Sequence, residues 1–398
     1  MKCINKQAFL LVFGFLITSN LFGQTFNQAY DNIVNQCSQT NINNDLTEFE
    51  ALGLKRRGTT QLQNTLDWLK NKYTSYGYST SQIVEYSYTY TGSTAVCKNL
   101  EVTKVGTTYP NIFVIVCGHY DSIGGTGTND NGSGLASILE IARLLKNVPT
   151  EYSIKFVNFS GEEDGLFGSK NYVSAIVNAT SPKMNIKLVF NLDEVGGVAG
   201  LTNNTITCEK DTTNTPSTNN AASATMTNQL MTCVSLYSPL TAFLSNAYAS
   251  DYMSFQSNNE VITGFFEKNE TTHKHTATDY LIYMDPVYNY KVAKAAIGAT
   301  LHFAVASTTL GNEENKKDFQ VSFFPNPTKD FLNINLGSLE DKNYTFSLID
   351  VNGKIVLEKK IVNATLVESV DIKTLSSGIY AAVLQTKDNR IVKKIVIE

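Results

Sequence analysis

Charged and imidazole side chains directly follow the apolar runs that we predict as buried strands, at residues 112–117, 152–159 and 186–192. Continuous apolar runs of this kind are typical of strands that are buried inside a largely parallel sheet. The carboxyl ends of such strands meet at one edge, where open α/β sheets bind ligands. The fold of this chain therefore has to bring these polar side chains together.

Helical patterns alternate with the strands. Leucines recur at helical spacing within residues 28–75, Ser133 is predicted to cap an apolar-faced helix, and a last helix covers residues 287–306. Residues 202–229 are rich in Asn and Thr, so we expect part of this segment to be a surface loop, with a helix from near Ser217. This alternation predicts an α/β fold with a mixed, largely parallel central sheet sandwiched by helices.

The amino-terminal residues have the composition of an export signal. Lys2 and Lys6 precede a short apolar stretch, and Gly23 offers a small residue for cleavage, so we expect removal of residues 1–23. No apolar run is long enough to span a bilayer, which predicts no integral membrane segment. Without these residues the 32 basic residues fall to 30 against 36 acidic ones, so we expect no nucleic-acid partner.

At 398 residues the chain is too long for one average domain. We expect a first domain at residues 24–306, a polar linker at 307–320 and a second domain at 321–398. In the last segment, short alternating strands are separated by turn signals such as Asn352-Gly353. This texture predicts a small C-terminal β-sandwich.

The exported chain keeps five cysteines, which are Cys37, Cys97, Cys117, Cys208 and Cys233. Export permits disulfides, and an odd number leaves at least one free thiol. Cys97 and Cys117 lie symmetrically about a turn near Gly106, so they face each other if their strands form a hairpin. We favour two buried thiols for that pair, and Cys208 with Cys233 is a second possible bridge.

His119 follows the strand at 112–117. A neutral imidazole at the carboxyl end of a strand points into the ligand-binding crevice. Asp121, two residues further on, could hold the other ring nitrogen and fix the tautomer. The alternative is a lone surface histidine.

Asp130 lies in a loop rich in Gly and Asn, directly before the helix at Ser133. A carboxylate in the positive field of a helix N-terminus can use both oxygens to bridge two cations. The alternative is an ordinary capping loop.

Glu162, Glu163 and Asp164 follow the strand at 152–159. Adjacent acids at the exit of an apolar strand repel one another unless a cation offsets them. One glutamate can bind a metal while its neighbour serves as a general base. The alternative is a solvated acidic turn.

Asp193 follows the strand at 186–192, and His273 and His275 lie in a late segment. His302 falls within the last helix, where we expect a packing or surface role. Taken together, carboxylates and imidazoles at successive strand ends form a site with mixed nitrogen and oxygen ligands. That donor set favours zinc, with cobalt or manganese as possible substitutes.

The order of these motifs resembles the co-catalytic di-zinc aminopeptidase family over about residues 28–306. Two features carry the resemblance: Glu-Glu followed by Gly-Leu-Phe-Gly-Ser, and His275-Thr276 with Asp279 four residues after the histidine. The resemblance implies two Zn²⁺ ions that Asp130 bridges. It implies that Glu163 and His275 hold one ion, and that His119 and Asp193 hold the other.

The resemblance also implies an activity, which is the removal of N-terminal residues from peptides by a secreted metallo-exopeptidase. Glu162 would act as general base on a water shared by the metals. Tyr248 is similar to a family position near the tetrahedral intermediate, or it is a packed aromatic. Asp121, Asp251 and Asp279 are expected to support the ligands or the substrate. Family members often carry Ser-Asp-His where this chain has Ser250-Asp251-Tyr252, so the local pocket chemistry can differ.

The second domain resembles the C-terminal sorting domain of the type IX secretion system. The resemblance rests on Phe324-Pro325-Asn326-Pro327, on residues 348–354 and 375–380, and on the terminal Lys393-Lys394. It implies the type IX machinery as a partner, and export through the periplasm to the cell surface or the medium. The alternative is a generic β-sandwich that binds carbohydrate or stiffens a stalk.

Three other functions remain open for the first domain. A glutaminyl cyclase is an acyltransferase of the same fold that uses one zinc. A carboxypeptidase would act at the opposite end of the peptide. A non-catalytic surface-binding protein would not need Glu162 together with every expected ligand.

Overall fold

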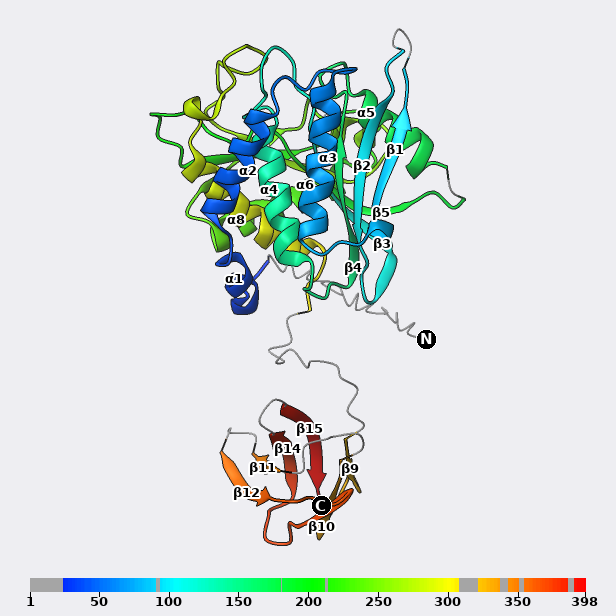
Figure 1. Ribbon diagram of the computed structural model, residues 1–398, viewed down its shortest axis with the longest axis vertical. Helices are drawn as coiled ribbons and strands as arrows, with labels where there is room; N and C mark the ends of the chain where they lie inside the picture. Colours follow the sequence, from blue (N-terminus) through cyan, green and yellow to red (C-terminus); the bar gives the residue numbers. More distant parts are fainter. Residues whose placement is uncertain are drawn as a thin grey trace, which may run out of the picture. The chain divides into compact units, whose positions relative to one another are not determined.

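The computed structural model describes residues 24–90, 94–179, 181–211, 214–307, 321–336, 343–350, 354–385 and 390–398. The chain divides into two compact units, Met1–Thr308 and Thr309–Glu398 (Figure 1). The predicted signal peptide, nearly all of the predicted linker and the turn at Asn352-Gly353 lie outside the described residues. Among the described residues, no helix is both long and apolar enough to cross a membrane.

An eight-stranded mixed sheet runs through the first unit in the order β1-β2-β4-β3-β5-β8-β6-β7. Its strands are β1 Ile83–Tyr88, β2 Cys97–Lys104, β3 Tyr109–His119, β4 Tyr152–Phe159, β5 Asn185–Leu192, β6 Thr205–Lys210, β7 Thr241–Asn246 and β8 Ile262–Glu267. The central strands β4, β3, β5 and β8 are parallel, and β1, β2 and β6 join antiparallel to their neighbours on the centre side. The largely parallel centre predicted from the sequence is confirmed.

The apolar runs form the central strands because both of their faces are covered. Along β3, Val114 and Val116 enter the larger core, whereas Ile115 and Cys117 enter a second core on the other face. The register of β3 aligns the strand ends, with His119 opposite Phe159 of β4 and Cys117 opposite Asn191 of β5. The residues that follow these strands therefore emerge at one edge.

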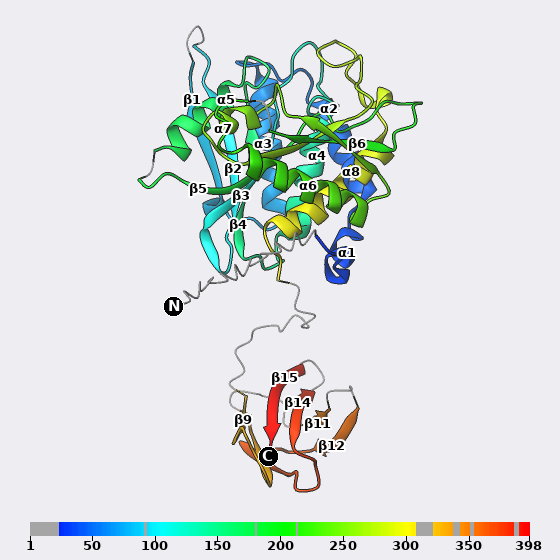
Figure 2. The ribbon, with the colours of Figure 1, turned by 180° about the vertical axis from the view of Figure 1, so that it is seen from behind.

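Helices cover both faces of this sheet. The larger core includes side chains from α1 Gln28–Val34, α2 Gln39–Ala51, α3 Thr60–Ser75, α4 Gly132–Leu145, α6 Asn220–Tyr237 and α8 Pro286–Phe303. The second core includes side chains from α5 Phe167–Tyr172, its continuation Val173–Val177 and α7 Tyr252–Gln256. Figure 1 views the sheet from the side of α2, α3 and α4, and α7 is labelled in the opposite view of Figure 2.

One local prediction was wrong and another was incomplete. Asn131 rather than Ser133 caps α4, because its side chain accepts the N–H of Gly134 at 3.0 Å. The Ser133 hydroxyl instead donates to the Asn129 carbonyl. Part of the Asn- and Thr-rich segment 202–229 was expected as a surface loop with a helix from near Ser217; the structure has the strand β6, whose four central residues are all buried, and then α6, which begins at Asn220.

The possible disulfides are also absent. All five cysteines of the described residues are free and buried. Cys97 and Cys117 cannot face each other across a hairpin, because β4 lies between their strands β2 and β3. Cys208 and Cys233 both contribute to the larger core as thiols.

The second unit contains two antiparallel sheets in the part of the chain that the structure describes. One has the order β13-β10-β9 and the other β12-β11-β14-β15. Their strands are β9 Ser322–Phe324, β10 Phe331–Asn335, β11 Tyr344–Ile349, β12 Ile355–Ile361, β13 Val367–Asp371, β14 Gly378–Gln385 and β15 Arg390–Ile397. Side chains from both sheets, such as Leu332 and Phe346, share one apolar core.

Candidate metal centre

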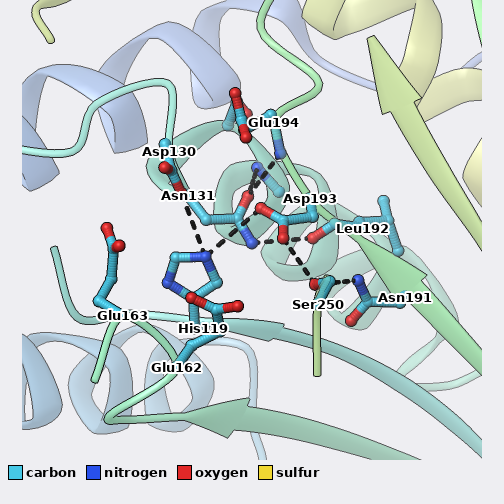
Figure 3. A network of polar contacts seen from close by, with 12 residues as sticks. His119, Asp130, Asn131, Glu162, Glu163, Asn191, Leu192, Asp193, Glu194 and Ser250 are labelled. Carbon is cyan, nitrogen blue, oxygen red and sulfur yellow. Dashed lines mark hydrogen bonds and ion pairs between the residues drawn. The ribbon is translucent and has the colours of Figure 1, made fainter. Parts of the chain in front are cut away.

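His119 and two carboxylates meet at the edge where the central strands end. Nε2 of His119 lies 3.2 Å from Oδ1 of Asp130 and 3.4 Å from Oδ1 of Asp193. All three residues are buried. Figure 3 shows these side chains turned toward one another from β3, from the loop before α4 and from the end of β5.

Asp130 also belongs to a second group. Its Oδ2 lies 3.1 Å from Nε2 of His275, which in turn lies 3.0 Å from Oε2 of Glu163. Within each group of three, the candidate ligand atoms lie within 4.8 Å of one another. The two oxygens of one carboxylate thus face two different imidazoles, which is the arrangement that a pair of neighbouring cations requires.

Polar contacts behind the centre fix its side chains. Ser250 donates to Oδ2 of Asp193 at 2.6 Å and accepts from Nδ2 of Asn191 at 2.8 Å. The carboxylate of Asp279 accepts the backbone N–H groups of Asn129 and Asp130. Contacts of this kind orient metal ligands and hold them in place.

Asp121 supports the site differently from the sequence-based expectation. Nδ1 of His119 lies 3.2 Å from the backbone carbonyl of Asp121 and 3.7 Å from its carboxylate. The carboxylate instead accepts the backbone N–H groups of Glu162 and Glu163 at 3.2 and 3.3 Å. Asp121 therefore contacts the ring of His119 through its backbone and the Glu-Glu turn through its side chain.

Two glycines allow the loop before Asp130 to approach the loop of His275. A Cβ on Gly124 would lie 2.4 Å from the His275 carbonyl oxygen, and one on Gly125 would lie 2.2 Å from that of Thr276. His275 itself has a φ of 57°, a left-handed conformation that is uncommon for residues other than glycine. The local backbone is shaped to bring His275 to the site.

The electrostatics of the centre favour a bound cation. Burial and nearby carboxylates raise the pKa of Glu163 to about 9 and hold the pKa of Glu162 well above its usual range. Burial disfavours a charged His119, but the carboxylates of Asp193 and Glu162 outweigh it and raise the pKa of the ring. Oε1 of Glu163 is buried without a hydrogen-bond partner among the described residues. A bound cation would offset the repulsion between these carboxylates and would give Oε1 of Glu163 a partner.

A cavity of about 320 Å³ opens onto the centre. Glu162 lines it, and the Glu162 carboxylate has no hydrogen-bond partner among the described residues. Tyr248, which is 54% exposed, lies on the wall with its ring centroid 6.4 Å from that of Phe266. Asp251 is buried and is not among the lining residues, and burial raises its pKa to about 7.

The other two histidines and Asp164 do not join the candidate metal centre. His273 stacks on Tyr283 at 3.9 Å, and His302 contacts Tyr237, so neither joins the centre. Asp164, the third acid of the turn, pairs with Arg56 at 3.0 Å. The sequence did not reveal the other polar residues of the cavity wall, which include Glu194, Glu209 and Lys274.

Comparison with protein-family models identifies the family to which this arrangement of residues belongs. Residues 99–300 match the model described as peptidase family M28. The chain belongs to peptidase family M28. Residues 322–398 match the model of a secretion system C-terminal sorting domain. Both family resemblances inferred from the sequence are confirmed.

Curated relatives of this M28 chain match it over a short segment. Aminopeptidase YwaD of Bacillus subtilis is 45% identical over 89 residues, which are 22% of this chain and 19% of the relative. An aminopeptidase of Pseudomonas aeruginosa is 42% identical over 88 residues, which are 22% of this chain and 16% of the relative. The chain thus matches about a fifth of the length of these relatives.

Solved structures confirm the aminopeptidase-like fold of this M28 chain. The LapA aminopeptidase of Legionella pneumophila superposes with a TM-score of 0.60 at 19% identity, covering 75% of this chain and 80% of LapA. A glutaminyl cyclase of Bacteroides thetaiotaomicron superposes with a TM-score of 0.54 at 14% identity, covering 66% and 97%. The fold alone therefore does not distinguish the two activities.

Proposed function

We propose that this M28 chain is a secreted, zinc-dependent aminopeptidase. One observation carries the proposal, which is that the two oxygens of Asp130 face the two imidazoles of His119 and His275. A single-metal site would need only one of those groups. The names of the relatives, several of which are aminopeptidases, support the same reaction.

Two Zn²⁺ ions fit the donor set, with Co²⁺ or Mn²⁺ as substitutes. Asp130 would be shared, His119 and Asp193 would complete one site, and Glu163 and His275 would complete the other. When bound, the ions would act as Lewis acids that polarise the scissile carbonyl and acidify water.

Glu162 is the proposed general base. Its carboxylate faces the cavity without a partner among the described residues, so it is free to accept the proton of the attacking water. The protonated carboxyl that results can then deliver this proton to the leaving amine. Tyr248, on the cavity wall, would donate its hydroxyl to the tetrahedral oxyanion.

The test uses the purified chain, bound-metal analysis and aminoacyl anilide substrates. We expect about two zinc ions per chain and hydrolysis that a chelator abolishes and zinc restores. A ratio of one zinc, with cyclisation of N-terminal glutamine, would favour a glutaminyl cyclase instead. Peptides blocked at either end distinguish the exopeptidases, because a carboxypeptidase would cleave those with a blocked amino terminus.

The sorting domain has a separate proposed role. It would carry the peptidase unit from the periplasm across the outer membrane through the type IX machinery. The match over residues 322–398 supports this role.

A further inference from the structure

One part of the cavity wall has no role in the proposed metal centre. Glu209, from β6, lines the cavity, and its Oε2 accepts the hydroxyl of Tyr252 at 2.6 Å. Tyr252 is the residue at which this chain departs from the Ser-Asp-His pattern. A Cβ on Gly264 would lie 2.8 Å from the Tyr252 ring and 3.2 Å from Oε2 of Glu209, so the absence of a side chain there makes room for the pair.

Glu209 presents one oxygen that the protein does not use. The residue is only 3% exposed, and no hydrogen bond to its Oε1 occurs within the described ranges. No lysine or arginine of those ranges pairs with it either. This oxygen is not among the fully buried atoms without a partner, so it is open to the cavity, where a ligand can supply the donor.

A second acidic residue of the cavity wall also favours a ligand that donates hydrogen bonds. Glu194 is 6% exposed, and its Oε2 is buried without a partner among the described residues. Its Oε1 lies 3.3 Å from Nζ of Lys274, which also pairs with Glu270. The one lysine among the lining residues is therefore shared between two carboxylates, and the wall keeps an excess of acceptors.

We propose that this wall receives the side chain of the first substrate residue and selects lysine or arginine. The inference rests on the proposed aminopeptidase function. The cationic head would donate to Glu209, while the rings of Tyr248 and Phe266 cover its aliphatic stem. An aliphatic side chain would leave the acceptors unpaired, and an acidic one would be repelled.

The protonation of Glu209 is compatible with this role. Burial raises the pKa of Glu209 to about 8. A cation within hydrogen-bond distance favours the ionised carboxylate and lowers that pKa again. Glu209 is then ionised in the complex with a lysine or arginine substrate, whose stability determines the specificity.

The experiment compares anilides of lysine, norleucine and glutamate with the full-length, zinc-loaded protein. Lysine and norleucine differ in the ammonium group, so the ratio of their kcat/KM values isolates its contribution. We expect a ratio of about ten or more, with the glutamate substrate slowest. In Glu209→Gln, which keeps the volume and an acceptor for Tyr252, this ratio should fall about tenfold.

Glu260→Gln is the matched control, because it removes the same charge from another buried glutamate, and neither Glu260 nor its partner Lys183 lines the cavity. Its ratio should stay within about twofold of the wild-type value. A wild-type preference for norleucine, or an unchanged ratio in Glu209→Gln, would overturn the inference. If Glu209→Gln does not fold, the wild-type ratio alone decides. Failure to hydrolyse any of the three anilides would instead refute the proposed function on which the inference rests.

Discussion

The carboxylate of Asp279 holds the backbone of Asp130, accepting its N–H at 3.1 Å through Oδ2 while Oδ1 accepts the N–H of Asn129 at 2.9 Å. The next peptide unit belongs to Asn131, the N-cap of α4. Asp130 is therefore fixed between the helix start on one side and a carboxylate from the loop of His275 on the other. This contact links the two loops that meet at the proposed metal centre.

Asp279→Asn should weaken metal binding without removing a ligand. An asparagine offers one acceptor oxygen, and its NH₂ group would face a backbone N–H, so Asp130 would lose its fixed position. Loss of such an orienting contact typically costs about 10- to 100-fold in metal affinity or activity. Titration with a competing chelator measures the affinity. Asp31→Asn on α1, far along the chain, is the control, and equal affinities in the two variants would contradict the assignment.

The proposed base and the proposed bridging ligand should respond differently to substitution. Glu162→Gln should keep both zinc ions and lower kcat by about 10²- to 10⁴-fold, because only proton transfer is removed. Asp130→Asn should lose metal, because one carboxylate serves both groups. Zinc content and kcat are measured on the same preparations. Full turnover in Glu162→Gln would mean that another group is the base.

Much of the centre was predictable because strand ends carry strong sequence signals. Apolar runs buried on both faces, such as those of β3, β4 and β5, are hard to mistake, and the residue after each one is fixed by its position. His119 and Asp193 follow directly from this logic. The structure brings them within 3.4 Å of each other.

Features set by pairing between distant segments were not predictable. The insertion of β4 between β2 and β3 depends on the register of the whole sheet, so the sequence left open a hairpin between the strands of Cys97 and Cys117 that the structure does not form. Glu209 was missed for a related reason. β6 lies within an Asn- and Thr-rich segment in which we expected no strand, and its pairing with β8 and β7 depends on distant parts of the chain.

Deletion of residues 321–398 should trap the chain in the periplasm of a host that has the type IX machinery. The signal peptide predicted at the amino terminus would still direct passage across the inner membrane, whereas the second step would lack its sorting domain. Anilide hydrolysis in periplasmic and medium fractions measures the distribution. The full-length chain is the control. Equal appearance of both forms in the medium would show that residues 321–398 are not needed for export.

His302 should make the stability of the peptidase unit depend on pH. Burial lowers its pKa from 6.5 to about 4, and the ring packs on Tyr30 and contacts the hydroxyl of Tyr237. The unfolded chain therefore binds more protons than the folded chain between pH 4 and 6.5, so the free energy of unfolding rises with pH across that window. After allowance for the partial exposure of the ring, the change is about 1 to 2 kcal/mol.

His302→Gln removes the titrating ring and should reduce the difference in unfolding free energy between pH 7 and pH 4.5 by that amount. Denaturant unfolding at the two pH values measures it, and the carboxylates of the metal centre contribute equally to both proteins. Tyr237→Phe is the matched control, because it deletes the hydrogen bond but leaves the imidazole buried, and it should retain the pH dependence. If His302→Gln and the wild type lose the same stability on acidification, the buried imidazole is not the group that titrates, because its removal would have left the proton balance of folding unchanged.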